Sequence, residues 1–156
     1  MKKFLLLISL SVALFGADQI KVDTKLYEMN KFKYETPQGR KMRVPNRTEL
    51  IVVAFEKDTG KLVNEYLNSK DPYYMPKRHA IFIADISEMP TIITNTFALP
   101  KLRKYKHPIY LHFNDEFADF VPHKDESVTI IRVKNKKVTD VSYIKTAAQL
   151  QAVIEK

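Results

Sequence analysis

The sequence contains no cysteine and only three glycines in 156 residues. The absence of cysteine excludes disulfides, thiolate catalysis, Cys-ligated zinc, Fe–S clusters and lipid attachment through an N-terminal Cys. Only Gly39 and Gly60 lie beyond the first 17 residues, so the chain cannot form the GxGxxG turn that approaches a dinucleotide pyrophosphate. It also lacks GxxxxGK[ST], GxSxG and HExxH. These absences remove the common catalytic signatures and indicate no cofactor.

What is present suits one folded domain with a targeting segment. Hydrophobic residues make up 45% and charged residues 28% of the chain, which is typical of a folded soluble body. The formal charge is +8, and without Lys2 and Lys3 the remaining body carries about +6. Such a charge favours acidic proteins, lipid headgroups and phosphorylated or carboxylated ligands. Nucleic acid would fit electrostatically, but export makes it an unsuitable partner.

The N-terminus has the three-part order of a secretory signal peptide. Lys2 and Lys3 precede an apolar run over 4–15, and the small residues Gly16 and Ala17 follow. The alternative is a membrane anchor, but the run has 12 residues against the ~20 that span a bilayer as a helix. We therefore expect a signal peptide over 1–17, cleaved after Gly16 or Ala17, a periplasmic address and no transmembrane span in the mature chain. We expect residues 18–30 to be flexible.

Residues 31–156 alternate strand and helix patterns. Alternation around Pro37-Gln38-Gly39 predicts a hairpin. Apolar runs predict buried strands, and spacings of three and four predict helices. The expected strands are 50–55, 80–84, 109–113, 128–133 and 138–144. The expected helices are 59–69, one starting near 90 and kinked or split at Pro100, and one after the capping-box sequence of Thr146 to Gln149. Residues 114–127 are expected to form an acidic, aromatic connection.

This order resembles the thioredoxin fold in its longer, peroxiredoxin-like form. The resemblance rests on LIVVAFEKDTGKLVNEYL as strand, loop and helix, on HAIFIADIS as the next strand, and on SVTIIRVKNKKVTDVSYIKTAAQLQAVI as the closing hairpin and helix. It is nearest to the YtfJ-like group of periplasmic proteins, which share an acidic pair before the closing hairpin, here Asp125-Glu126. The resemblance implies an α/β three-layer sandwich: a mixed central sheet with an N-terminal hairpin and a C-terminal β-hairpin plus helix.

The departures from that family decide the predicted function. Its reactive cysteine would lie in the loop over 55–61, where this chain has none. Its cis-proline would lie at Glu126-Ser127-Val128, which has no proline, or at His107-Pro108-Ile109; we prefer the first alignment. Either way the resemblance implies a scaffold without thiol redox chemistry.

Three sets of residues are candidate binding sites. A helix N-terminus at Glu56, Lys57, Asp58 and Thr59 could bind an anion, with Asp58 or Thr59 as the cap, although a capped helix with a solvated ion pair explains the same residues. Asp85 ends a central strand, where open α/β sheets bind ligands and where turn residues are also common. The third candidate is the densest basic patch of the chain, formed by Lys101, Arg103, Lys104 and Lys106. Tyr73 and Tyr74, which lie beside Lys77 and Arg78 in a loop, could extend this patch as exposed aromatic surface.

The four histidines do not predict a metal site. His107 and His112 lie five apart around a strand, so their side chains should point to opposite faces. The sequence favours a periplasmic binding or accessory domain over an enzyme, acting on an acidic envelope protein or a small anionic ligand. The alternative is an oxidoreductase-related protein of the flavin-associated dehydrogenase type, holding a cofactor without a glycine-rich motif.

Overall fold

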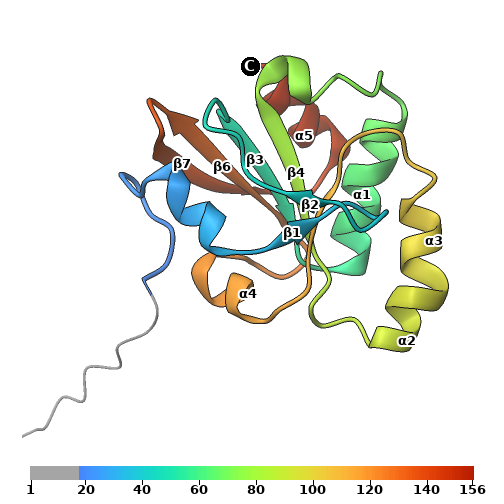
Figure 1. Cartoon of the computed structure of the whole chain (residues 1–156). Coiled ribbons are helices and arrows are strands. Elements are labelled where there is room, and N and C mark those ends of the chain that lie inside the picture. The colour runs from blue at the N-terminus through green and yellow to red at the C-terminus, as the bar shows by residue number, and fades with distance from the viewer. Residues whose placement is uncertain (1–17) are drawn as a thin grey trace, which may run out of the picture.

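The computed structural model describes residues 18–156 (Figure 1). The predicted signal peptide over 1–17 lies outside the described residues. Within residues 18–156, no helix combines the length and the apolar character needed to cross a bilayer.

A seven-stranded mixed sheet forms the centre of the fold, in the order β2-β1-β5-β4-β3-β6-β7. β3 runs parallel to β4, and β4 runs parallel to β5, as the strand–helix–strand order predicted. Antiparallel hairpins close both edges. The strands are β1 (Tyr34–Glu35), β2 (Lys41–Met42), β3 (Leu50–Ala54), β4 (Ala80–Asp85), β5 (Tyr110–His112), β6 (Val128–Lys134) and β7 (Lys137–Ile144).

Helices cover both faces of the sheet, so the predicted three-layer α/β arrangement is confirmed (Figure 1). One face packs against α1 (Lys57–Asn68), α5 (Ala147–Ile154) and the helical segment 91–102. The other packs against the 3₁₀ helix η1 (Leu26–Lys31) and α4 (Glu116–Phe120). A short 3₁₀ turn, η2 (Pro76–Arg78), precedes β4. β3 and β4 are buried along their whole length because they lie between two helical layers.

The segment predicted to be flexible, 18–30, instead packs on the sheet. Ile20, Leu26 and Met29 are buried. The backbone N–H groups of Asp23 and Leu26 donate to carbonyls of the β6–β7 hairpin, at 2.8 and 2.9 Å. The prediction was wrong because these partners lie more than 100 residues later in the chain, where a local pattern does not reveal them.

Residues 91–102 form one continuous helical column. The predicted split at Pro100 does not occur. The column consists of α2 (Thr91–Ile93), the π-helix η3 (Thr94–Ala98) and α3 (Leu99–Leu102). Proline lacks the N–H that would bond back along an α-helix. Here the N–H of Leu99 donates to the carbonyl of Thr94, five residues back, so the column widens just before Pro100 and continues through it.

Two other boundaries differ from the prediction. α1 begins at Lys57 with Glu56 as its N-cap, so Asp58 lies inside the first turn and does not cap the helix. The connection 114–127 contains α4, a helix too short for a periodic pattern. α5 begins as predicted: Thr146 and Gln149 each accept the other's backbone N–H, both at 3.2 Å.

Candidate functional site

The corner between β3 and α1 holds the loop at 55–61, where the resemblance places the reactive cysteine of thioredoxin-like enzymes. The backbone N–H of Glu56 donates to Oγ1 of Thr59 at 3.2 Å, and the Thr59 hydroxyl donates to the Glu56 carbonyl at 3.0 Å. These two contacts fix the first turn of α1. Thr59 is buried, whereas Glu56, Lys57 and Asp58 are exposed.

The Glu56 side chain reaches across to the loop that precedes β6. Its Oε1 accepts the backbone N–H of Glu126 at 2.7 Å, and Glu126 has a left-handed backbone with φ +56°. β6 is the antiparallel neighbour of β3, whereas β5 pairs with β4 and β1. The loop at Glu126-Ser127 therefore faces the corner, which agrees with the preferred of the two sequence alignments.

Asp85 ends β4 beside His112 of β5, its partner in the parallel register. The Asp85 carboxyl is buried, and its Oδ1 accepts the backbone N–H of Ser87 at 3.0 Å. Burial raises the pKa of Asp85, and the hydrogen bonds from Ser87 oppose that rise. Nδ1 of His112 donates to the carbonyl of Lys33 at 2.9 Å, while the buried Nε2 has no partner among the described residues.

The raised pKa of Asp85 makes a testable prediction. A carboxyl whose folded pKa is raised stabilises the fold while protonated, and this contribution is lost as the pH rises through the folded pKa. Asp85→Asn keeps an oxygen acceptor for Ser87 without a charge. We expect it to raise the thermal midpoint at pH 7 by roughly 2–4 °C, and the gain to shrink at pH 4 and below. Asp119→Asn, at an exposed carboxyl, is the control; an equal gain from both variants would contradict the prediction.

The basic patch predicted at 101–106 lies on α3 and the turn that follows it. Its four side chains are exposed. They are not equivalent, because Nε of Arg103 donates to the carbonyl of Pro37 at 2.9 Å and so attaches α3 to the N-terminal hairpin. Lys101, Lys104 and Lys106 form no ion pair among residues 18–156.

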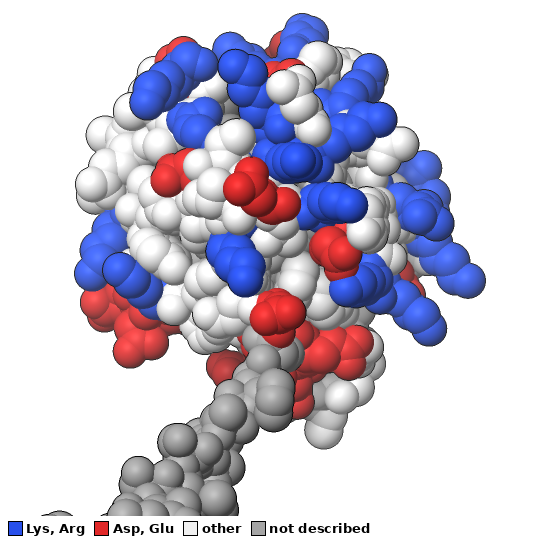
Figure 2. Space-filling view, turned by 90° about the vertical axis from the view of Figure 1, so that its left-hand side faces the viewer, with Lys and Arg blue, Asp and Glu red and all other residues white. Residues whose placement is uncertain are grey.

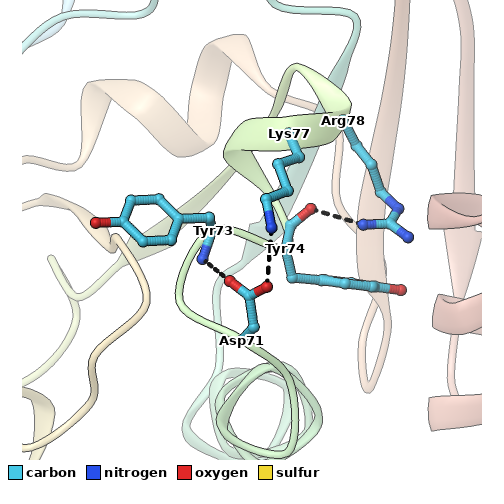
Figure 3. A network of polar contacts seen from close by, with 5 residues as sticks. All are labelled: Asp71, Tyr73, Tyr74, Lys77 and Arg78. Atoms are coloured by element: carbon cyan, nitrogen blue, oxygen red, sulfur yellow. Dashed lines mark hydrogen bonds and ion pairs between the residues drawn. The ribbon is translucent and has the colours of Figure 1, made fainter.

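The aromatic extension of the basic patch predicted at Tyr73 and Tyr74 is only partly present (Figure 3). Tyr73 is exposed, but Tyr74 is buried, and its hydroxyl donates to Glu155 at 2.9 Å. Lys77 pairs with Asp71 at 3.0 Å. The Arg78 guanidinium lies 4.0 Å from the centre of the Tyr74 ring and donates to the Tyr74 carbonyl. Lys77 and Arg78 therefore serve local structure, and Tyr74 does not belong to an exposed surface.

Charge is unevenly distributed over the molecule. On the face that carries β7 and η1, Lys and Arg gather toward one end and Asp and Glu toward the other (Figure 2). The acidic end holds α4 and the start of α1 (Figure 1). Exposed carboxylates at these elements and the loop before β6 outnumber the cations Lys57 and Lys124, so the local field disfavours a bound anion. The exposed carboxylates are those of Glu56, Asp58, Asp115, Glu116, Asp119, Asp125 and Glu126.

The histidines are dispersed, and no group of three His, Asp or Glu among residues 18–156 is arranged to hold a metal ion. Nε2 of His107 lies 2.8 Å from Oδ1 of Asn64 on α1. His112 packs among Phe32, Tyr34 and Phe117 on the other side of the sheet. The two side chains thus lie on opposite faces, as the strand pattern predicted.

One small cavity opens between η2 and the loop that precedes β3. It has a volume of about 140 Å³ and is lined by Thr48, Met75 and Phe82 among others. This is well below the ~300–1,000 Å³ of common small-molecule sites. The buried Thr48 hydroxyl has no partner among the described residues, and we assign it no role.

Comparison with known proteins establishes the fold. No protein-family model matches the chain, and no curated protein sequence is significantly similar to it. Solved structures do match. Peroxiredoxin Q of Xanthomonas campestris has a TM-score of 0.55 at 14% identity, covering 88% of this chain and 96% of that one. The chain has the thioredoxin-like fold. At such identities the likeness shows the fold alone.

Two further structures give the same result. An uncharacterized thioredoxin-like protein from Porphyromonas gingivalis has a TM-score of 0.55 at 12% identity, covering 85% of this chain and 92% of that one. StoA from Bacillus subtilis has a TM-score of 0.53 at 12% identity, covering 80% and 96%. This chain keeps the scaffold but has no cysteine anywhere in its sequence.

Sequence reasoning missed two features of the site. The contact between Glu56 and Glu126 joins residues 70 apart and depends on a left-handed turn, for which the sequence offers only the polar run before Val128 as a signal. Nε2 of His112 has no hydrogen-bond partner among the described residues because the side chains packed around it are aromatic. The alternation of Tyr110 and His112 along one face of a buried strand was the available hint.

Proposed function

We propose that this chain is an exported, periplasmic domain that uses the thioredoxin-like fold for binding and not for thiol–disulfide chemistry. The observation that carries the proposal is at the β3–α1 corner. The chain has no cysteine. The Glu56 carboxylate accepts the backbone N–H of Glu126 in the facing loop, so this N–H is not free to bind a ligand. A corner closed in this way, and surrounded by carboxylates, favours a function located on another surface.

Two sequence features support the cellular location. The charged, apolar and small-residue order of 1–17 is typical of a signal peptide. The resemblance to the YtfJ-like group, which is periplasmic, points to the same compartment and remains a prediction.

The basic side chains of α3 and the following turn are the binding surface that we favour. From Met89 to Asn114 the sequence contains no Asp or Glu, so no acidic side chain of this segment offsets the charge of Lys101, Lys104 and Lys106. Clustered cations of this kind attract acidic proteins and anionic ligands and speed their encounter. We therefore propose an acidic envelope component as the binding partner.

Reversing the charge of Lys101, Lys104 and Lys106 to Glu should weaken that binding strongly. We expect at least about tenfold weaker retention of envelope components, because three attractive charges become repulsive. Affinity capture from a native envelope extract at low salt, with the bound fraction quantified, measures it. Arg103 stays unchanged because it holds the hairpin.

The matched control reverses Lys134, Lys136 and Lys137, three exposed lysines at or next to the β6–β7 turn. Both variants lose the same net charge, so a nonspecific electrostatic effect would weaken both equally. Equal retention by the α3 variant and the unmodified chain would contradict the proposal.

A further inference from the structure

Three large apolar side chains project from the helical column over 91–102 into solvent. Ile92 is 76%, Ile93 42% and Phe97 64% exposed. The column stands beside α1 at the outer side of the molecule (Figure 1). Its inner side packs on the core through Leu99 and Leu102, so the outer apolar side chains contribute little to the fold and call for another explanation.

The π-turn is the segment that carries Phe97. It covers Thr94–Ala98 and is closed by the N–H of Leu99, which donates to the carbonyl of Thr94, while Ile92 and Ile93 come directly before it in α2. Thr94 is buried, and its hydroxyl donates to the Pro90 carbonyl at 3.2 Å, which anchors the inner side of the turn. Isoleucine and phenylalanine are thereby presented on the outer side of one short helix.

Cations border this apolar face. Lys101 and Lys104 follow Phe97 by one and two helical turns, both are exposed, and neither forms an ion pair among the described residues. The absence of acidic residues between Met89 and Asn114 leaves their charge uncompensated within the segment. An apolar stripe with lysines beside it is the pattern of a helix that lies in a bilayer interface.

We propose that this helical face docks the domain on an anionic phospholipid bilayer, with Ile92, Ile93 and Phe97 inserted among the lipids. Lys101 and Lys104 would contact the headgroup phosphates. The inference rests on the proposed function, because it names the anionic partner of the same α3 surface.

The observations favour a bilayer over a protein partner. The exposed apolar surface of this column is limited to three side chains, whereas a stable protein interface takes about 20–30 residues from each partner. Lysine is also depleted at the centre of protein interfaces, but near an anionic bilayer each lysine adds attraction. The same argument from size disfavours a second copy of this chain as the occupant.

The chain contains no tryptophan, so a single introduced indole reports its own surroundings. The protein for this test is residues 18–156, which contains every strand of the sheet and both of its apolar cores and lacks the apolar run of the signal peptide. We expect the emission of Phe97→Trp to shift to the blue with vesicles of phosphatidylglycerol and phosphatidylcholine in equal parts. Tyr73→Trp, at an aromatic residue 66% exposed elsewhere on the surface, should show no shift.

Co-sedimentation with the same vesicles measures affinity. Replacing both Ile92 and Phe97 by Ser should weaken binding more than about tenfold, because two large apolar groups no longer leave water. Replacing Lys101 and Lys104 by Gln should weaken it about tenfold at low salt and remove the preference over pure phosphatidylcholine vesicles. Circular dichroism of each variant should match that of the unmodified domain, because all four side chains are exposed.

Two results would overturn the bilayer proposal. One is the absence of vesicle binding while an envelope protein is still captured through Lys101, Lys104 and Lys106, which leaves the proposed function standing. The other is an oligomer in sedimentation that depends on Ile92 and Phe97 and does not bind vesicles. Failure of both vesicle binding and charge-dependent capture would overturn the proposed function as well.

Discussion

Lowering the pH from 7 to 4 should destabilise this protein by up to about 3 kcal/mol through His107 alone. His107 is 6% exposed and lies in the connection from α3 to β5. Burial lowers its pKa to about 4, from 6.5, because the charged imidazolium would lose its hydration. Its polar contact is Oδ1 of buried Asn64, at 2.8 Å from Nε2.

The direction of the effect follows from proton uptake. Between pH 6.5 and about 4 the unfolded chain binds a proton at His107 that the folded protein does not bind, so acid favours unfolding. The contribution is complete above pH 6.5 and is lost progressively as the pH falls toward 4. Carboxylates titrate over the same range, so the total slope alone does not identify His107.

A variant isolates the His107 contribution. His107→Gln stays neutral throughout, so urea unfolding at pH 7, 6, 5 and 4 should give a shallower loss of stability than in the unmodified protein. Its stability at pH 7 will be lower because the packing changes, and only the slope tests the prediction. The control is His79→Asn, which removes an exposed imidazole at a left-handed position that asparagine tolerates. Parallel pH profiles for His107→Gln and the unmodified protein would refute the assignment.

Replacing Phe117 by alanine should cost about 3–5 kcal/mol. Phe117 is fully buried in α4, and its ring packs edge-on against Phe32 at 5.2 Å and Tyr34 at 6.1 Å between centroids. It also stacks at a tilt near Phe55 and His112. Removal leaves a cavity among rigid aromatic rings that collapse poorly. A loss of this size is a large share of the 5–15 kcal/mol that stabilises a typical domain.

Phe97→Ala is the matched control, because the same atoms are removed from a side chain that is mostly in solvent. We expect that variant to change the free energy of unfolding by less than about 0.5 kcal/mol. Urea denaturation of both variants measures the free energy of unfolding, and the slope of that free energy against urea concentration should be the same in both. Similar small losses for both would show that α4 is not part of the core.

The sequence predicted those parts of the fold whose signals are local. The continuous apolar run of β3 required burial on both faces, and the residues of the β6–β7 turn, Asn135 and Lys136, do adopt the left-handed backbone of a tight hairpin. The capping pair Thr146 and Gln149 marked the start of α5 correctly. Each of these depends on neighbours within a few residues.

The parts that were missed depend on distant contacts. Ile20 is fixed because its N–H donates to the carbonyl of Phe120 at 2.9 Å, a partner 100 residues later. The π-turn before Pro100 is invisible in a pattern that assumes regular helix. The basic patch at 101–106 was found from charge alone, which could not separate Arg103, bound to the hairpin, from Lys101 and Lys104 beside it.

The place of β3 in the sheet also bears on when the protein can fold. β3 lies between β4, which follows it closely in the chain, and β6, which begins only at Val128. A growing chain therefore has no partner for one edge of its most buried strand until its last quarter has been made. Under the export that we propose, this delay is useful, because translocation in an unfolded form requires that the sheet not close during synthesis.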